Sequence, residues 1–338
     1  MGLEKQIRSA KNESERRQAA GRVEEMAMWA WRARMLISDL KATKLYDGRQ
    51  VRDSSKRASA AKKLGAARVS AAVQPLIEAL EDEFVAQEAA MALSQIGDPR
   101  AIEPLYHRLK RMTYTVQPAG QSSVFNEGIG RATGQALASF ALQHPDAMEL
   151  LVRLLTDKNR GARDIAARNL RTLAELGAWQ PRTLKEQVCF LVATGQAKKA
   201  AELGDPVIEP LAELACHLAA QDREDGLAYV AMEALASIHS PRNVETLIRF
   251  LSNDRAAFQH FAAEALGKIG DPRAIPHLAR LTKAFTYDHF HGANKTLADT
   301  ARAVLVSMGA PARETIKALT NDSHPGVREW AQSALAKV

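Results

Sequence analysis

Two short clusters contain side chains that carry out chemistry in many proteins. Asp288, His289 and His291 combine a carboxylate with two imidazoles, which are metal ligands, but this spacing does not by itself make a closed site. Cys216 and His217 are adjacent, as a thiol and its activating base can be. Neighbouring residues on a helix point in different directions, so this pair does not predict a nucleophile.

Other catalytic or cofactor-binding patterns are equally weak. The glycine-rich GIGRATG at 128–134 has no strand before it, so it does not predict a phosphate-binding loop. Cys189 and Cys216 form neither a CxxC zinc pair nor a disulfide framework. We therefore expect no metal and no cofactor, and the sequence favours a non-catalytic protein without settling whether it is an enzyme.

One phrase occurs twice in the chain almost unchanged. Residues 86–105 read AQEAAMALSQIGDPRAIEPL, and residues 259–278 read QHFAAEALGKIGDPRAIPHL. Small and apolar residues recur at steps of three and four, which indicates one face of a helix. The glycine is typical of a helix C-terminus, and the Asp-Pro that follows is typical of the start of the next helix. Each unit is therefore predicted to be a helix, a tight turn and an antiparallel helix.

Such hairpins cannot bury their apolar faces alone and must stack on one another. The phrase resembles the short HEAT repeats found in phycobilin lyases and deoxyhypusine hydroxylases. The resemblance covers roughly residues 55–338, with a gap near 112–200, and it implies an all-α fold, an α-α superhelix or HEAT-repeat solenoid. The expected domains are an N-terminal helical cap at 1–50 and a HEAT-like solenoid at 51–338, irregular at 112–130, 178–205 and 284–295.

The resemblance also implies roles for individual residues. Arg100 and Arg273, in the two GDPR phrases, would join an Asp–Arg ladder between repeats. Deoxyhypusine hydroxylases bind iron through His-Glu pairs, but this sequence has no such pair, and Gln87-Glu88 stands at the matching position of the first copy. The resemblance thus implies the fold without that iron site. It leaves open a lyase-like role in attaching a prosthetic group to a partner protein.

Positive charge gathers in the N-terminal fifth of the chain. The net charge is +7, and residues 1–70 alone contain 17 Lys and Arg against 8 Asp and Glu. Most of this excess lies in the basic stretch, residues 41–68, which is either a solvated helix face or a contact for a phosphate backbone. Tyr46 is its one aromatic residue, so base stacking is not indicated. Its candidate binding residues are Lys41, Lys44, Arg49, Arg52, Lys56, Arg57, Lys62 and Lys63.

The second helices of the repeats would line the concave face of a superhelix. That face is mixed in charge and locally basic, and its candidate binding residues are His107, Arg108, Arg111, Arg249, His277, Arg280 and Lys283. Two long loops that both begin with Thr-Tyr follow equivalent second helices, at 112–130 and 284–295. Loops of this length are often functional. They contribute the candidates Tyr114, Gln117, Tyr287, His289 and His291.

These features together predict a non-catalytic scaffold that holds a protein partner between its concave face and two inserted loops. Nucleic-acid binding through the basic stretch and the concave arginines is the alternative, and lyase-like prosthetic-group attachment is a second one. No apolar run is long enough to span a membrane, and the N-terminus lacks the apolar segment of a signal peptide. We therefore expect a cytoplasmic location and no membrane partner, with the oligomeric state left open.

Overall fold

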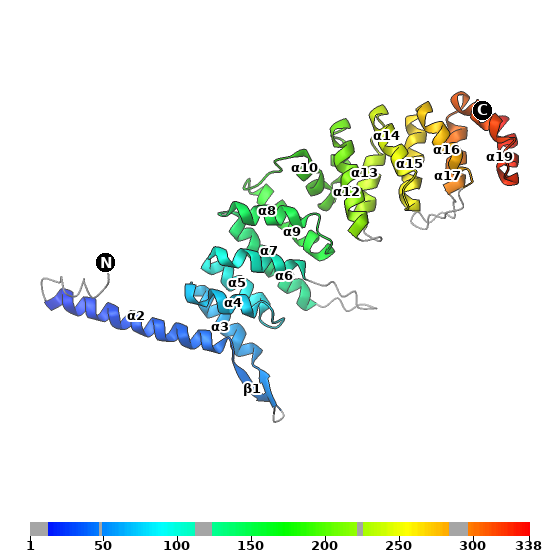
Figure 1. Cartoon of the computed structure of the whole chain (residues 1–338). Helices are drawn as coiled ribbons and strands as arrows, with labels where there is room; N and C mark the ends of the chain where they lie inside the picture. Colours follow the sequence, from blue (N-terminus) through cyan, green and yellow to red (C-terminus); the bar gives the residue numbers. More distant parts are fainter. Residues whose placement is uncertain (1–12, 47–48, 112–123, 222–225, 284–296) are drawn as a thin grey trace. The chain divides into compact units, whose positions relative to one another are not determined.

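The computed structural model describes residues 13–46, 49–111, 124–221, 226–283 and 297–338. The chain divides into two compact units, residues 1–179 and residues 180–338, so the expected boundary at residue 50 lies inside unit 1. In the described part, helices and turns make up the whole fold apart from one two-stranded hairpin (Figure 1). This confirms the predicted all-α class.

Unit 1 begins with a long helix and a β-hairpin, and continues as a series of helices. Helices α3, α5, α7 and α9 are the first helices of successive repeats and pack side by side in that order. The elements are α2 (Glu13–Asp39), β1 (Thr43–Tyr46), β2 (Arg49–Arg52), α3 (Ser54–Ala66), α4 (Val73–Ala79), α5 (Ala86–Ile96), α6 (Ile102–Lys110), α7 (Val124–Ala141), α8 (Pro145–Leu154) and α9 (Arg160–Glu175).

Unit 2 repeats the same arrangement of helix pairs. Its first helices α11, α13, α15 and α17 pack in sequence, and α19 packs against α18 as the first helix of a final, truncated copy. The elements are α10 (Leu184–Ala193), α11 (Ala197–Ala201), α12 (Ile208–Gln221), α13 (Gly226–Ala236), α14 (Val244–Phe250), α15 (Ala256–Ile269), α16 (Ile275–Leu281), α17 (Leu297–Ser307), α18 (Arg313–Leu319) and α19 (Pro325–Leu335). In the described ranges, every helix is too short or too polar to cross a membrane.

The turn between paired helices follows the predicted chemistry, with one addition. Gly97 ends α5 in the left-handed conformation at φ 75°, and Gly270 ends α15 at φ 72°. The Asp98 carboxylate accepts a hydrogen bond from the Arg100 N–H at 3.0 Å, as an N-cap should. The proline that follows begins a three-residue 3₁₀ helix, Pro99–Ala101, before α6 starts. The second helix therefore begins one turn later than the sequence pattern indicates.

The ladder implied by the family resemblance is present in unit 2. Arg273 donates to both carboxylate oxygens of Asp271 in its own turn, at 3.0 and 2.8 Å. The same guanidinium reaches the preceding hairpin, where it contacts the Glu245 carboxylate and the Pro241 carbonyl, each at 3.1 Å. Arg242, at the equivalent place one repeat earlier, lies 3.4 Å from Asp205. These arginines link each hairpin to the hairpin before it.

Small residues let the first helices approach closely. The α5 face that the repeat pattern predicts is fully buried, with Ala89, Ala92 and Leu93 all at 0% exposure. Gly65 of α3 lies directly opposite, and a Cβ added to it would stand 2.6 Å from the Cα of Ala92. The α3–α5 contact is therefore a backbone-to-backbone contact, with no space for a larger side chain at Gly65.

The structure differs from the sequence-based expectation in two places. Residues 43–46 and 49–52 form two antiparallel strands, with Thr43 opposite Arg52 and Tyr46 opposite Arg49, inside and just beyond the expected helical cap. Residues 124–130, expected to be irregular, belong to α7, where Ile129 is buried. The region 178–205, for which the sequence indicates short helices, contains α10 and the one-turn helix α11, and Cys189 is buried.

Candidate functional site

Cations on the second helices of unit 2 lie against carboxylates of the neighbouring second helix. Arg249 of α14 donates to Glu209 of α12 at 2.6 Å, and the Thr246 hydroxyl donates to the same oxygen at 3.1 Å. The hydrogen bond from Arg249 holds the pKa of Glu209 below its usual value. Lys185 of α10, the helix before these pairs, also reaches this face and contacts Glu213 of α12 at 2.8 Å. This face therefore presents alternating charges that are already paired.

The next part of the same face is held in a similar way. Arg280 and His277, one turn apart on α16, are joined by a hydrogen bond of 2.8 Å between Nη2 and Nδ1. Lys283 lies 2.8 Å from Asp322, which follows α18. The hydrogen bond from Lys283 lowers the pKa of Asp322. The structure thus brings the predicted residues of this face into ordered pairs, but it does not gather them into one cluster.

Unit 1 repeats this pattern on its own second helices. Arg111, at the end of α6, contacts Glu81 at 2.5 Å, and His107 lies 3.4 Å from Glu103 on the same helix. Arg108 is half-buried, and its Nε has no hydrogen-bond partner among the described residues. Lys110, two residues further on, pairs with Asp157 at 3.1 Å, and the hydrogen bond that its ammonium donates to that carboxylate raises the pKa of Lys110.

Arg57, one residue of the predicted basic stretch, is buried and contributes to the fold, so it is not available at the surface. Arg57 is only 7% exposed, and its Nε donates to the Leu40 carbonyl at 2.5 Å. Its Nη1 donates to Asp82, which is itself 8% exposed. A buried guanidinium with two internal acceptors cannot contact a partner's phosphates. Arg57 is therefore removed from the candidate binding residues.

The rest of the basic stretch is partly neutralised by neighbouring carboxylates. Arg52 pairs with Asp82 at 3.2 Å, Lys56 with Asp39 at 2.9 Å, and Lys62 with Glu88 at 3.9 Å. Lys41 and Lys63 are exposed and form no ion pair with any described residue. Lys44 and Arg49 belong to the strands of the hairpin.

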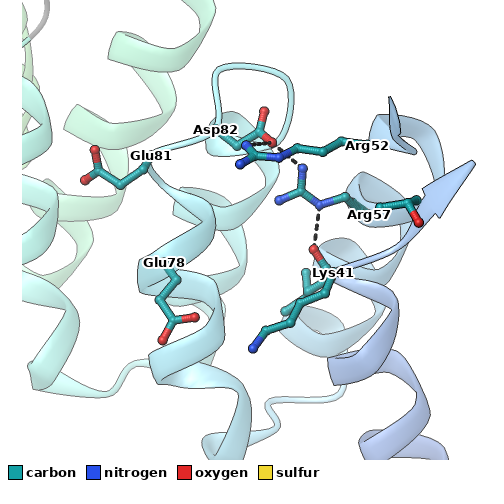
Figure 2. Close-up of a pocket in the computed structure, with 8 residues that line it drawn as sticks. Lys41, Arg52, Arg57, Glu78, Glu81 and Asp82 are labelled. Atoms are coloured by element: carbon teal, nitrogen blue, oxygen red, sulfur yellow. Dashed lines mark hydrogen bonds and ion pairs between the residues drawn. The ribbon is translucent and has the colours of Figure 1, made fainter. Parts of the chain in front are cut away.

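A pocket that the sequence did not predict lies between the hairpin and α4 (Figure 2). Its volume is about 410 Å³. Arg52 and Arg57 converge on Asp82 at one side of it, so these three charged groups also build its wall. The lining residues are Leu40, Lys41, Thr43, Arg52, Arg57, Glu78, Glu81 and Asp82.

The pocket's Asp82 belongs to a recurring turn after the second helices. Its Oδ1 accepts a hydrogen bond from the Phe84 N–H at 3.0 Å. The side-chain oxygens of Asp157, Asn253 and Asp322 each accept the same bond from the backbone N–H two residues later, at 2.9, 3.0 and 2.9 Å. In the three Asp turns, the other oxygen pairs with a Lys or Arg. The signal in the sequence is an Asp or Asn two or three residues after the last apolar residue of these four second helices, α4, α8, α14 and α18.

The five loop candidates lie outside the described residues. They are Tyr114, Gln117, Tyr287, His289 and His291, and their part in any binding surface stays a prediction. Within the described ranges, no group of three or more His, Cys, Asp or Glu side chains is placed to hold a metal ion.

The two cysteines should differ in reactivity. Burial raises the pKa of the Cys189 thiol to about 11 and also raises the pKa of Cys216, but Cys216 is exposed and Cys189 is buried. Since the thiolate is the reactive form and must be reached by the reagent, we expect one thiol to react with Ellman's reagent at pH 8 in the native protein and two in denaturant. Rapid labelling of the native Cys216→Ser variant would contradict this assignment.

Comparison with known proteins identifies the class of these helix hairpins. Residues 44–119 and residues 211–288 match the family model of HEAT repeats. The chain is therefore an all-α protein that contains HEAT repeats, as the repeated phrase predicts. No curated protein matches the chain significantly.

Two solved structures match the chain at low similarity. Human deoxyhypusine hydroxylase in complex with glycerol is 18% identical, with a TM-score of 0.32, and the match covers 91% of this chain and 96% of that one. The complex of CpcE and CpcF of phycocyanin lyase from Nostoc sp. PCC7120 is 20% identical, with a TM-score of 0.28, over 90% of this chain and 93% of that one.

Proposed function

We propose that this HEAT-repeat chain is a scaffold that binds a protein partner along the second-helix face of unit 2, which comprises the exposed side chains of α12, α14, α16 and α18. One observation carries the proposal: cations of this face are paired with carboxylates of a neighbouring repeat, as Arg249 is with Glu209 and Lys283 is with Asp322. Arg249 and Glu209, for example, are 63% and 60% exposed while in contact. A surface of alternating paired charges suits the mixed charges of another protein surface.

The same observation counts against a phosphate backbone as the partner. A polyanion binds through cations whose counterions it releases, and each carboxylate beside an arginine weakens that gain. Arg111, Arg249 and Lys283 all have such a carboxylate within hydrogen-bond distance. Lys41 and Lys63 remain exposed without an ion pair in the described part, which is the observation that keeps nucleic-acid binding as the second candidate.

The test is a double charge reversal on the second-helix face of unit 2. Arg249→Glu with Arg280→Glu places two new carboxylates on exposed positions of α14 and α16 without disturbing the core. We expect the variant to lose the stoichiometric partner that the unaltered protein retains from native extract. The loss in affinity should be at least about tenfold, because reversed charges repel where paired charges attracted.

The matched control reverses two exposed lysines on first helices of the same unit. Lys198→Glu with Lys268→Glu makes a similar change in net charge on α11 and α15, and partner recovery should be unchanged. Equal recovery by both double variants would contradict binding through the second-helix face. Retention on DNA or RNA that weakens steeply between about 50 and 200 mM salt would favour the second candidate instead.

A further inference from the structure

Helix α2 exposes large apolar side chains that the rest of unit 1 does not cover. Its C-terminal end is anchored, because Leu40, just after the helix, is 3% exposed and α2 packs against α3. Several side chains in the middle of the helix, by contrast, are largely exposed. Met28 is 64% exposed, Trp31 62% and Met35 48%, and their spacing of three and four residues places them on one helix face.

A stripe of this kind on a water-exposed helix is typical of an interaction surface. Tryptophan and methionine are enriched at the centres of protein interfaces, and three such side chains on one face leave a substantial apolar area in water. Trp29 lies outside this stripe, and the Arg32 guanidinium sits 5.9 Å from its ring centroid. We name Met28, Trp31 and Met35 the α2 stripe.

The charges along α2 are arranged so that the helix is complementary to an inverted copy of itself. Glu24 and Glu25 precede the centre of the stripe, and Arg32 and Arg34 follow or flank it. All four side chains are exposed, and none forms an ion pair with a described residue. Glu25 and Arg32 are seven residues apart, so they occupy the same position beside the stripe. In an antiparallel pair that packs Met28 against Trp31 of its partner, equivalent flanking positions face each other, and Glu25 of each copy lies beside Arg32 of the other.

We propose that the α2 stripe is the interface between two copies of this chain, which associate through antiparallel α2 helices. Met28 and Trp31 of each copy form the two central layers, and two symmetric Glu25–Arg32 contacts flank them. This arrangement uses the same surface patch on both copies, as a two-fold symmetric dimer requires. The surface is separate from the second-helix face, so dimerisation and partner binding are independent of each other.

The experiment measures the mass of the full-length chain by sedimentation equilibrium over a range of concentrations. We expect a reversible monomer–dimer equilibrium, and Trp31→Ser should raise its dissociation constant by at least about thirty-fold, as for an interface hot spot. Because Trp31 is exposed, the circular dichroism spectrum should not change. Lys63→Ser, on the exposed face of α3, is the control and should leave the dissociation constant unaltered.

Charge variants test the antiparallel register. Arg32→Glu alone and Glu25→Arg alone should each weaken self-association, because like charges then face each other across the pair. Mixing the two variants should restore the dimer as a heterodimer, since each then meets its opposite. A chain that is monomeric at every concentration would overturn the proposal, and so would a dimer that all three α2 variants leave unaltered. Binding of that monomer to anionic lipid vesicles would assign the stripe to a lipid surface instead.

Discussion

Replacing Asp82 by Asn should lower the free energy of unfolding by about 3–5 kcal/mol, because it leaves the buried Arg57 charge without its counter-charge. Both side chains are nearly inaccessible, at 9% exposure for Arg57 and 7% for Asp82. Arg52 also contacts the same carboxylate (Figure 2). Urea unfolding followed by circular dichroism measures the change.

The contribution of Asp82 should also depend on pH. Burial alone would raise its pKa, but the hydrogen bonds from Arg57 and from the Phe84 N–H outweigh burial, so the pKa is lowered from 3.8. A depressed carboxylate pKa stabilises the folded state above the unfolded pKa, and that stability is lost as the pH falls through the folded pKa. The stability difference between wild type and Asp82→Asn should therefore be full at pH 7 and shrink below about pH 4.

The control for this prediction is the neighbouring acid. Glu83 is exposed, so Glu83→Gln should change stability by no more than about 0.5 kcal/mol at any pH in this range. If the two variants were equally stable, the Arg57–Asp82 pair would not hold the hairpin, α3 and α4 together.

Replacing Gly65 by Ala should destabilise the protein by about 1–3 kcal/mol, although alanine is the better helix former. The new Cβ would lie 2.6 Å from the Cα of Ala92 and 2.8 Å from its Cβ. A backbone atom cannot rotate away as a side chain can, so α3 and α5 must move apart and the buried contact around Leu93 is loosened. Thermal unfolding at matched concentration gives the difference.

The same substitution at an open helical position provides the comparison. Gly226 begins α13, and a Cβ there meets no described atom within 4 Å. Gly226→Ala should therefore be neutral or slightly stabilising. Equal destabilisation by both variants would mean that helix propensity, and not the close approach of α3 to α5, decides the outcome at Gly65.

The repeat was predictable because its signals are local. Gly97, Asp98 and Pro99 each have a conformational preference that is expressed within a few residues, and the structure places all three in the predicted turn. Ala89 and Ala92 repeat with the period of a helix, so their burial also follows from the sequence. The fold class and the residues that form the turn could therefore be predicted from the sequence alone.

The pairing of charges was not predictable in the same way. Arg57 and Lys63 look alike in the basic stretch, yet one is buried against Asp82 and the other is exposed. Both residues belong to α3, but Arg57 is on the side of the helix that faces Leu40 and Asp82, whereas Lys63 is on the exposed side. Similarly, the sequence near Arg249 does not indicate an ion-pair partner for it. Its partner is Glu209 of α12, which is 40 residues away in the sequence and 2.6 Å away in the structure. Long-range contacts decided which candidates stay available to a partner.

The backward reach of Arg273 and Arg242 has a mechanical consequence for unit 2. Each of these arginines ties its own turn only to the hairpin immediately before it. Stability in such an array is a sum of terms between adjacent members, so an inner hairpin is held from two sides and a terminal one from a single side. Local unfolding should therefore start at the terminal hairpins, and the hairpins in the middle of the array should be the most rigid.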